Sequence, residues 1–444
     1  MVVNTTENSA AAEENVLRSP KFWLAPVILV GIVMGLLAWL YMGWILNPQD
    51  NIRNFPIAVV NQDEGATVPA SPGSPSPSGE KENLGNTITT ALLDNVPKSQ
   101  VDLKQMDWAT AQSEMSKGTV YGAIVIPSNF TTATGELAIA AAKGTPITKP
   151  TITVYTNPRA GSIPVALVQG ITTPALAAVN TKVAAQLTAE TNEQLKSAGA
   201  PALSGPGAYV LSEPITVSDV QFHPLPAGTG FGLSAFYYSL LLVLAGFTGA
   251  TIVNSLVDGM LGYIPSEVGP KVVNRARVGL TRFQLLLVKW ACVTFMATAI
   301  SGLYVGVCTA LGMSIPNMLL LWLYGVLAIS AIGITAMSVM AAFGGIGLLI
   351  NLIVFVILDL PSSGGTIPLE AEPRVYSVLS IFEPMRQVFL GVSSIIYFDA
   401  QSAAGLGRAL LMTVIGLLIG VLFGLFVTRY YDRKGLDRTA AEPA

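Results

Sequence analysis

Charged residues are scarce in this sequence. Only 11% of its 444 residues are Asp, Glu, Lys or Arg, whereas about 25% is usual in a soluble protein. Hydrophobic residues make up 51%, and the mean hydropathy is +0.57. The charge-free runs gather toward both ends of the chain, while the middle has the composition of a water-soluble domain. We therefore expect an integral membrane protein with a soluble insert.

Cysteine and histidine are also rare. The two cysteines, Cys292 and Cys308, lie in one apolar run, about 24 Å apart if it is helical, which excludes a disulfide within that helix. The single histidine, His223, has neither the clustered Cys, Asp or Glu of a metal site nor a serine or cysteine motif for which it would act as a base. We expect no enzyme, no bound metal and no catalytic residue.

A nucleotide-binding motif is missing too. The phosphate-cradling pattern GxxxxGK[ST] does not occur, so we expect no cofactor, and ATP would act only through a separate partner subunit. The glycines at 228, 230 and 232 lead into an apolar helix rather than a βαβ unit, which favours a structural loop. A net charge of −3 leaves no basic surface of the kind that binds nucleic acid.

Long apolar runs predict six transmembrane helices. Residues 290–358 carry no charge, which is enough for about three crossings of ~20 residues each. The turn residues at 314–317 and the pair Gly344-Gly345 divide this run twice. The six helices are expected at residues 22–46, 231–253, 285–313, 318–340, 343–360 and 409–428.

Basic flanks set the orientation. Lys and Arg are in excess in the loop 254–284 and in the tail, and the positive-inside rule places both, with the two termini, in the cytoplasm. The fold class is therefore an α-helical integral membrane protein with six transmembrane helices and an extracytoplasmic α/β domain inserted between helices 1 and 2. The expected segments are a cytoplasmic N-terminal segment (1–21), transmembrane helix 1 (22–46), the extracytoplasmic α/β domain (47–228), transmembrane helices 2–5 with the cytoplasmic loop 254–284 (229–360), an extracytoplasmic amphipathic hairpin (361–405), transmembrane helix 6 (406–428) and a cytoplasmic tail (429–444).

The insert has an α/β pattern. Short apolar runs predict strands at 57–60, 121–126, 152–155 and 215–220. Helical periodicity falls between them, at 84–93, 108–115 and 163–195. The proline- and serine-rich stretch 69–82 predicts a disordered loop.

Several segments resemble one family of membrane proteins. They are NPQDNIRNFPIAVVNQDEGA (47–66), the stretch from W-x-A to YGAIVIPSNF (108–130), HPLPAGTGFGLSAFYYSLLL (223–242), SSGGTIPLE (362–370) and FEPMRQVFLG (382–391). Together they resemble the phage-infection-protein (YhgE/Pip) family, a branch of the type-2 ABC transporter permease superfamily. The resemblance implies six spans, a large domain after the first, and a re-entrant or external helical hairpin between the fifth and sixth. The domain is much shorter here than in members that act as phage receptors or type VII secretion accessories.

A basic loop is the first candidate site. Since energy for transport would have to come from a separate ATPase, we expect that subunit to dock on the loop 254–284, which is long enough for a short coupling helix. Its basic residues are Lys271, Arg275, Arg277 and Arg282. The alternative is that these residues only set the topology or touch anionic lipid.

Small residues at four-residue spacing form the second candidate. Gly416, Gly420 and Gly424 lie on one face of the predicted sixth helix, where they allow another helix to approach closely. The same spacing occurs at Gly31 and Gly35, and at 302, 306 and 310. The sixth helix is the preferred face for a homodimer, or for a heterodimer with a similar permease; packing within one chain is the alternative.

Polar residues in or beside the apolar runs form the third candidate, a substrate pathway. Asn351 either lines a cavity or bonds to a neighbouring helix. Arg374 and Arg386, in the amphipathic hairpin, either meet a lipid headgroup or pair with nearby glutamates. Lys289 is expected to reach back to the cytoplasmic interface, and Asp359 to lie at the outer interface or to cap the next helix.

These patterns favour a permease of the bacterial cytoplasmic membrane that exports a lipid, an envelope precursor or another hydrophobic or amphipathic compound. The amphipathic hairpin beside the last spans supports this interpretation. The alternative is a scaffold or receptor without transport activity, whose outer domain binds an envelope protein, a secretion-system protein or a phage.

Overall fold

A computed structural model of the chain describes residues 48–67, 81–146, 148–436 and 438, with scattered positions between 20 and 42. The chain forms two compact units, Met1–Pro48 and Gln49–Ala444. The described positions between 20 and 42, among them Leu24 and Ile28, are helical. Apart from these positions, the predicted segment 1–21 and first span 22–46 lie outside the described residues, as does the predicted loop from 69 to 80.

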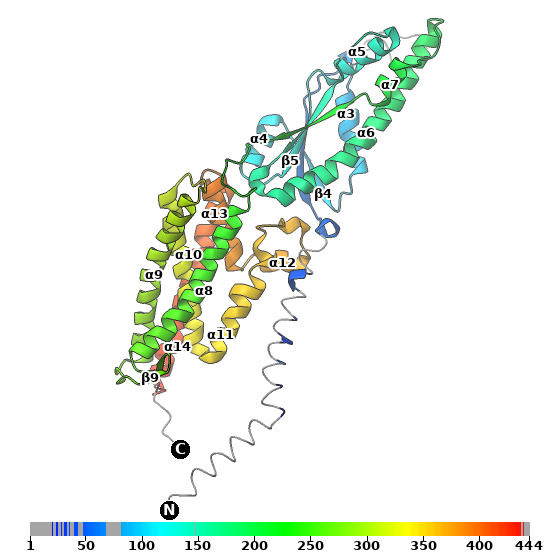
Figure 1. The fold of residues 1–444 in the computed structure, drawn as a ribbon. Helices are drawn as coiled ribbons and strands as arrows, with labels where there is room; N and C mark the ends of the chain where they lie inside the picture. Colours follow the sequence, from blue (N-terminus) through cyan, green and yellow to red (C-terminus); the bar gives the residue numbers. More distant parts are fainter. Residues whose placement is uncertain are drawn as a thin grey trace, which may run out of the picture. The chain divides into compact units, whose positions relative to one another are not determined.

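A mixed five-stranded sheet forms the centre of the α/β domain (Figure 1). β1 lies between β4 and β5 and is parallel to both, β6 is antiparallel to β5, and β7 is parallel to β6. Every residue of β5 is buried, as expected for an apolar strand covered on both faces. The strands in sheet order are β4 (Val101–Gln105), β1 (Phe55–Asn61), β5 (Gly122–Ile126), β6 (Thr151–Thr156) and β7 (Thr216–Gln221).

Helices cover this sheet. The longest, α6, packs against strands β5 and β6 and against helices α3, α5 and α7. A small antiparallel ribbon joins β2 (Ala66–Thr67) to β3 (Lys81–Glu82), so the predicted disordered loop ends in a strand. The helices are α3 (Leu84–Asn95), α4 (Trp108–Ser116), α5 (Phe130–Lys143), α6 (Ser162–Ser197) and α7 (Pro206–Ser212).

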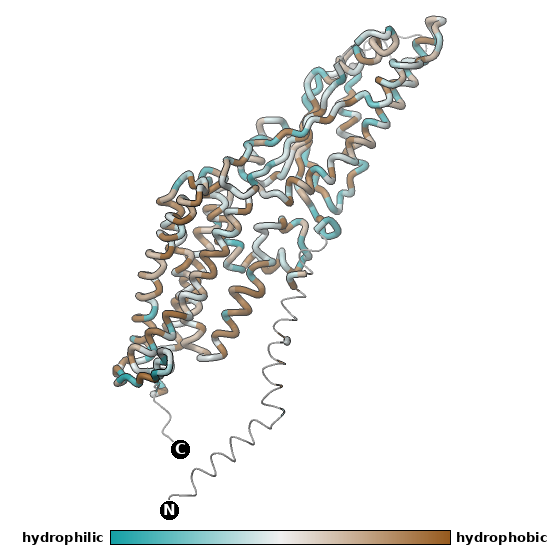
Figure 2. The backbone as a smooth tube through the Cα atoms, in the orientation of Figure 1, coloured by the Kyte–Doolittle hydropathy of each residue, from teal (hydrophilic) through white to brown (hydrophobic). Residues whose placement is uncertain are grey.

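Four long helices form a bundle: α8 (Ser234–Met260), α9 (Arg282–Ala310), α10 (Met318–Phe343) and α14 (Leu406–Arg433). The central helix is α10, which packs against the other three and buries most of its residues. The predicted turns are confirmed, because Asn317 caps the start of α10 and Gly344, with a φ of 59°, ends it. Figure 2 shows the apolar residues along these helices.

Five helices in the described part of the chain are long and apolar enough to cross a membrane, namely α6, α8, α9, α10 and α14. The protein is therefore a multi-pass membrane protein with a helical majority and a small amount of sheet. Of the five, α6 differs in that it packs on the sheet of the α/β domain and buries Leu167, Val168 and Leu176.

The segment after α10 contains a shorter apolar helix. It begins as α11 (Gly345–Leu352) and continues as a π-helix, η3 (Ile353–Leu358). α12 (Arg374–Leu379) and α13 (Pro384–Tyr397) follow. The predicted surface hairpin is only partly at the surface: Phe382 is 76% exposed, but α13 packs against α8, α10 and α14 and belongs to the core of the bundle.

Candidate functional site

A cavity of about 490 Å³ lies among the helix ends at one end of the bundle. We call this end of the bundle the far end. Here α8 and α14 end and α9 begins, and the hairpin between α8 and α9 projects from it (Figure 1). We call this space the far-end cavity. The residues that line it come from α8, α9, α10, α11, α14 and the tail.

Three charged side chains meet at the far-end cavity. The Asp258 Oδ1 atom lies 2.7 Å from the Lys289 Nζ atom and 2.9 Å from the Arg438 Nη1 atom. Lys289 also donates a hydrogen bond to the Asn254 side-chain oxygen, 2.7 Å away. Asp258 is 3% exposed and Lys289 5%. Since an isolated buried charge is very costly, this ion pair explains how both charges are tolerated between apolar helices.

This pairing was not predicted. Lys289 was expected to reach back to the cytoplasmic interface, and Asp258 was not singled out. A signal existed in the sequence, because Asp258 directly follows one uncharged run and Lys289 directly precedes the next. One apolar helix ends with an acid and the next begins with a base, so the two charges lie at the same end of the helix pair and favour an ion pair.

Part of the cavity wall is apolar. Side chains of Leu285, Leu286, Met337, Met340 and Leu348 line it, from the three helices α9, α10 and α11. The cavity therefore combines a charged end with an apolar wall. Such a combination suits an amphipathic molecule better than a fully polar one.

The end of α14 holds the start of α9 in place. The Asp432 carboxylate accepts hydrogen bonds from the backbone N–H groups of Arg282 and Phe283, at 2.9 and 3.1 Å. These N–H groups belong to the first turn of α9 and have no partner within that helix. The Arg282 guanidinium lies over the Tyr431 ring, 5.2 Å from its centroid. The tail thus closes one side of the far-end cavity.

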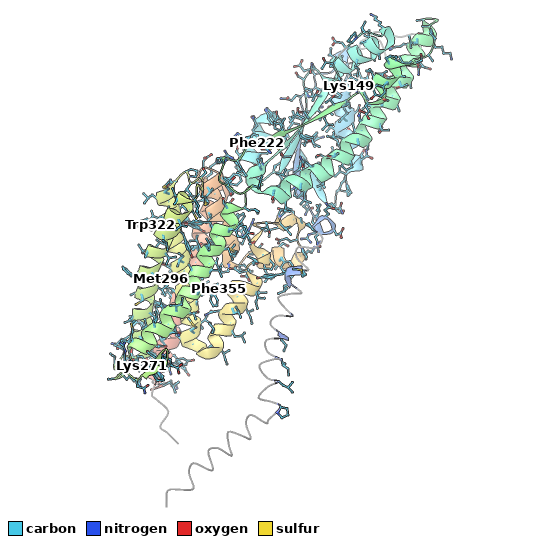
Figure 3. All side chains as sticks on the ribbon, in the orientation of Figure 1. Lys149, Phe222, Lys271, Met296, Trp322 and Phe355 are labelled. Atoms are coloured by element: carbon cyan, nitrogen blue, oxygen red, sulfur yellow. The ribbon has the colours of Figure 1, made fainter. Side chains whose placement is uncertain are left out.

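The predicted docking loop is a β-hairpin and not a short coupling helix. Strands β8 (Ser266–Val268) and β9 (Lys271–Val273) pair antiparallel. Lys271 and Arg275 are exposed, and Figure 3 labels Lys271 at the far end of the bundle. Arg277 is exposed too and lies over the Tyr263 ring, 5.1 Å from its centroid. The fourth predicted residue, Arg282, instead starts α9 and lines the far-end cavity.

The three predicted pathway residues do not meet. Asn351 is buried and donates a hydrogen bond to the Ala336 carbonyl of α10, at 3.0 Å, which is the helix-to-helix alternative. Arg374 is exposed at the start of α12. The Arg386 Nη1 atom donates to the Ser363 carbonyl at 3.2 Å, with Glu370 and Glu372 among the charged groups facing it.

The α/β domain and the segment before α12 are joined by hydrogen bonds. The Tyr121 hydroxyl donates to a Glu370 carboxylate oxygen at 2.9 Å, and the Arg53 backbone N–H donates to the Glu370 carbonyl at 2.7 Å. Burial, followed by the charge of Glu370, raises the pKa of Tyr121 well above its usual value, so the hydroxyl keeps its proton. Arg53 also donates to the Glu372 carbonyl, at 2.6 Å.

Two buried carboxyl groups face each other at the start of α13. Asp359, 2% exposed, accepts a hydrogen bond from the Met385 backbone N–H at 2.6 Å, so it caps α13 and not the helix that follows it directly. Burial raises the pKa of Glu383, the residue before α13, to about 7. In the described part of the chain, no three His, Cys, Asp or Glu side chains gather into a possible metal site.

The three glycines of α14 differ in whether another helix packs against them. A Cβ atom at Gly420 would meet Thr335 of α10, and one at Gly424 would meet Ser338 and Trp290. Both glycines therefore serve close packing inside the chain. A Cβ at Gly416 would meet nothing within 4 Å, and the same is true at Gly31 and Gly35. Only Gly416 of the predicted α14 dimer face remains open to a second chain.

Comparisons with known proteins bear on the identity of the chain. Among solved structures, it is similar to the crystal structure of "a domain of a putative ABC type-2 transporter" from Thermotoga maritima MSB8, at 15% sequence identity and a TM-score of 0.22 over 37% of this chain and 84% of that one. No protein with a curated description matches it. A family model described as a protein of unknown function (DUF3533) matches residues 26–427. The chain belongs to the DUF3533 family.

Proposed function

We propose that this protein is the permease subunit of a type-2 ABC-like exporter of the bacterial cytoplasmic membrane. It moves a lipid, an envelope precursor or another hydrophobic or amphipathic compound. The observation that carries the proposal is the far-end cavity, which combines apolar and charged side chains and lies among long apolar helices. The segments that resemble the YhgE/Pip family, from 47–66 to 382–391, support the same class of protein.

The proposed topology has six spans with both termini in the cytoplasm. α8, α9, α10 and α14 account for four, and residues 22–46 and the short apolar helix Gly345–Leu358 for the other two. α6 is excluded because it packs on the sheet. The basic residues of the β8–β9 hairpin and of the tail favour a cytoplasmic far end, which leaves the α/β domain outside.

The proposed energy source is a separate ATPase subunit. The chain carries no phosphate-cradling motif, and the β8–β9 hairpin offers exposed cations at the proposed cytoplasmic face, namely Lys271, Arg275 and Arg277. We propose this hairpin as the docking surface. The permease would pair with a second permease chain through the open face of α14 around Gly416.

Purification from the native membrane tests the proposal. The tagged full chain is expected to bring down an ATPase that carries a GxxxxGK[ST] loop, and the preparation should hydrolyse ATP. Charge reversal of Arg275 and Arg277 to Glu places acids where cations meet the partner, so the ATPase should be lost. The measurement is the ratio of ATPase to tagged chain, together with the hydrolysis rate.

A matched double variant serves as the control. Lys143 and Lys182 are exposed on the α/β domain, and reversing both to Glu makes the same change in charge away from the hairpin. This control should keep the ATPase. A stable, homogeneous preparation with no ATPase from native membranes would contradict the proposal, and equal loss in both double variants would contradict docking on the hairpin.

A further inference from the structure

We infer that the far-end cavity binds an anionic group, a phosphate or a carboxylate, carried by its ligand. The inference deepens the proposed function, because it names the chemistry of the compound that enters the permease. Its support is the balance of charge in the cavity, the hydrogen-bond donors left there, and the shape of the wall.

The charges that line the cavity do not balance. Three cations, Lys289, Arg282 and Arg438, face one carboxylate, Asp258. The nearby Asp432 carboxylate accepts hydrogen bonds from the backbone N–H groups of α9 and keeps its charge, so three cations stand against two carboxylates. The cavity therefore carries an excess of positive charge, which an anion would offset.

Donors remain for such an anion. An ammonium group has three N–H donors, and Lys289 directs two of them to Asp258 and Asn254. A guanidinium has five donors, and Arg438 binds Asp258 through Nη1. Arg438 also lies over the Tyr263 ring, 5.3 Å from its centroid, which holds its planar group beside Asp258. Guanidinium and ammonium groups fixed side by side are well suited to phosphate or carboxylate oxygens.

The wall of the cavity favours an anion that is attached to an apolar chain. The side chains of Met337, Met340 and Leu348 continue from the charged end. The volume of about 490 Å³ is within the range of small-molecule sites and exceeds the needs of a single inorganic ion. If Lys289 and Arg438 bind the anionic head group of a ligand, its apolar chain would lie against Met337, Met340 and Leu348.

The test is a binding measurement on the full chain in discs of phosphatidylcholine. The probes are hexyl phosphate, hexanol and inorganic phosphate, all soluble without forming micelles at low concentration. Hexyl phosphate should bind and raise the Tm, and hexanol at the same concentration should not. Arg438→Gln and Lys289→Met should each weaken hexyl phosphate binding at least about tenfold, the loss expected for one charged donor.

Arg433→Gln is the matched control. Arg433 ends α14 and is exposed outside the cavity. The Arg433→Gln variant loses the same charge from the same part of the chain. It should bind hexyl phosphate as the unmodified protein does. If Lys289→Met fails to fold, the Arg438→Gln variant alone tests the inference. The Arg438 side chain is already 32% exposed in the tail, so its replacement should leave the fold intact.

The three probes separate the sources of the anion. Tighter binding of hexyl phosphate than of inorganic phosphate supports a lipid-like head group, and equal binding of both supports a free anion at the same site. Equal binding of hexanol and hexyl phosphate, or unchanged binding in both cavity variants, overturns the inference. The assay contains no ATPase, so failure to co-purify an ATPase would sink the proposed exporter without affecting this result.

Discussion

The α/β domain and the helical bundle satisfy their polar groups in different ways. In the domain, one carboxylate joins separate elements: Asp63 accepts hydrogen bonds from the backbone N–H groups of Gly65, Gly85 and Thr131 and from the Thr131 hydroxyl. In the bundle, hydroxyls such as that of Ser338 bond to a carbonyl four residues earlier in their own helix. The Asp63 carboxylate therefore joins separate elements of the domain, whereas the Ser338 hydroxyl bonds only within its own helix.

The Asp63→Ala variant is the strongest test of this difference between the α/β domain and the bundle. Four hydrogen bonds are lost, and buried N–H groups at the starts of α3 and α5 lose their acceptor. We expect the domain to lose at least about 3 kcal/mol of stability. Limited proteolysis of the full chain should then cut within residues 81–221 while the fragment from α8 to α14 survives.

The matched control is Asp94→Ala. Asp94 is exposed near the end of α3, so removing its carboxylate should change stability by less than about 0.5 kcal/mol. If the protease cut both the domain and the bundle of Asp63→Ala, the two regions would unfold together. The proposed difference between them would then be wrong.

The buried carboxyl group of Glu383 predicts how the stability of the full chain depends on pH. Its pKa is raised from 4.5 to about 7 by burial, so the folded state binds more protons than the unfolded state between these values. The resulting stability is complete below about pH 4.5 and is lost as the pH rises to about 7.

The Tm of the full chain should therefore fall between pH 5 and 8, and Glu383→Gln should fall less over the same range. Glu136→Gln removes an exposed carboxyl of α5 and should follow the unmodified protein. An identical pH profile in Glu383→Gln and the unmodified protein would refute the assignment to Glu383.

The smallest expected effect tests close packing in the bundle. At Gly420 an added methyl group would lie 2.9 Å from the Thr335 Cα atom, so α10 and α14 must move apart. Gly420→Ala should cost about 1–2 kcal/mol, measured as a lower Tm. Gly416→Ala adds the same methyl group where nothing lies within 4 Å, and it should leave the Tm unchanged or raise it. A fall in Tm for Gly416→Ala alone would place the tight contact at Gly416 and not at Gly420.

Patterns along the chain predicted much of the fold. Asn317 and Gly344 marked the limits of α10 because capping and left-handed residues act locally. The strands β1, β5, β6 and β7 were recognised from their apolar runs, but β4 was missed, since its sequence VDLKQ is mostly polar. The depth of α13 was also missed, because a 14-residue apolar face looks the same whether lipid or other helices cover it.

The candidate site was harder to predict. Asp258, Lys289 and Arg438 come from three distant segments, and Arg438 lies 180 residues after Asp258. Charge alone marked Lys289 as unusual, and only the ends of the two uncharged runs pointed to Asp258 as its partner. The β8–β9 hairpin was expected to be a helix because a basic loop of that length suits either structure.

The closure of the far-end cavity by the tail has a consequence for biosynthesis. The Asp432 contact with α9 and the Arg438 contact with Asp258 each join residues at least 149 positions apart. During translation, α8 and α9 leave the ribosome long before either tail residue exists. Until the tail is made, Asp258 has Lys289 but not Arg438, and the first turn of α9 lacks the Asp432 cap. The far-end cavity thus becomes complete only at the last stage of assembly.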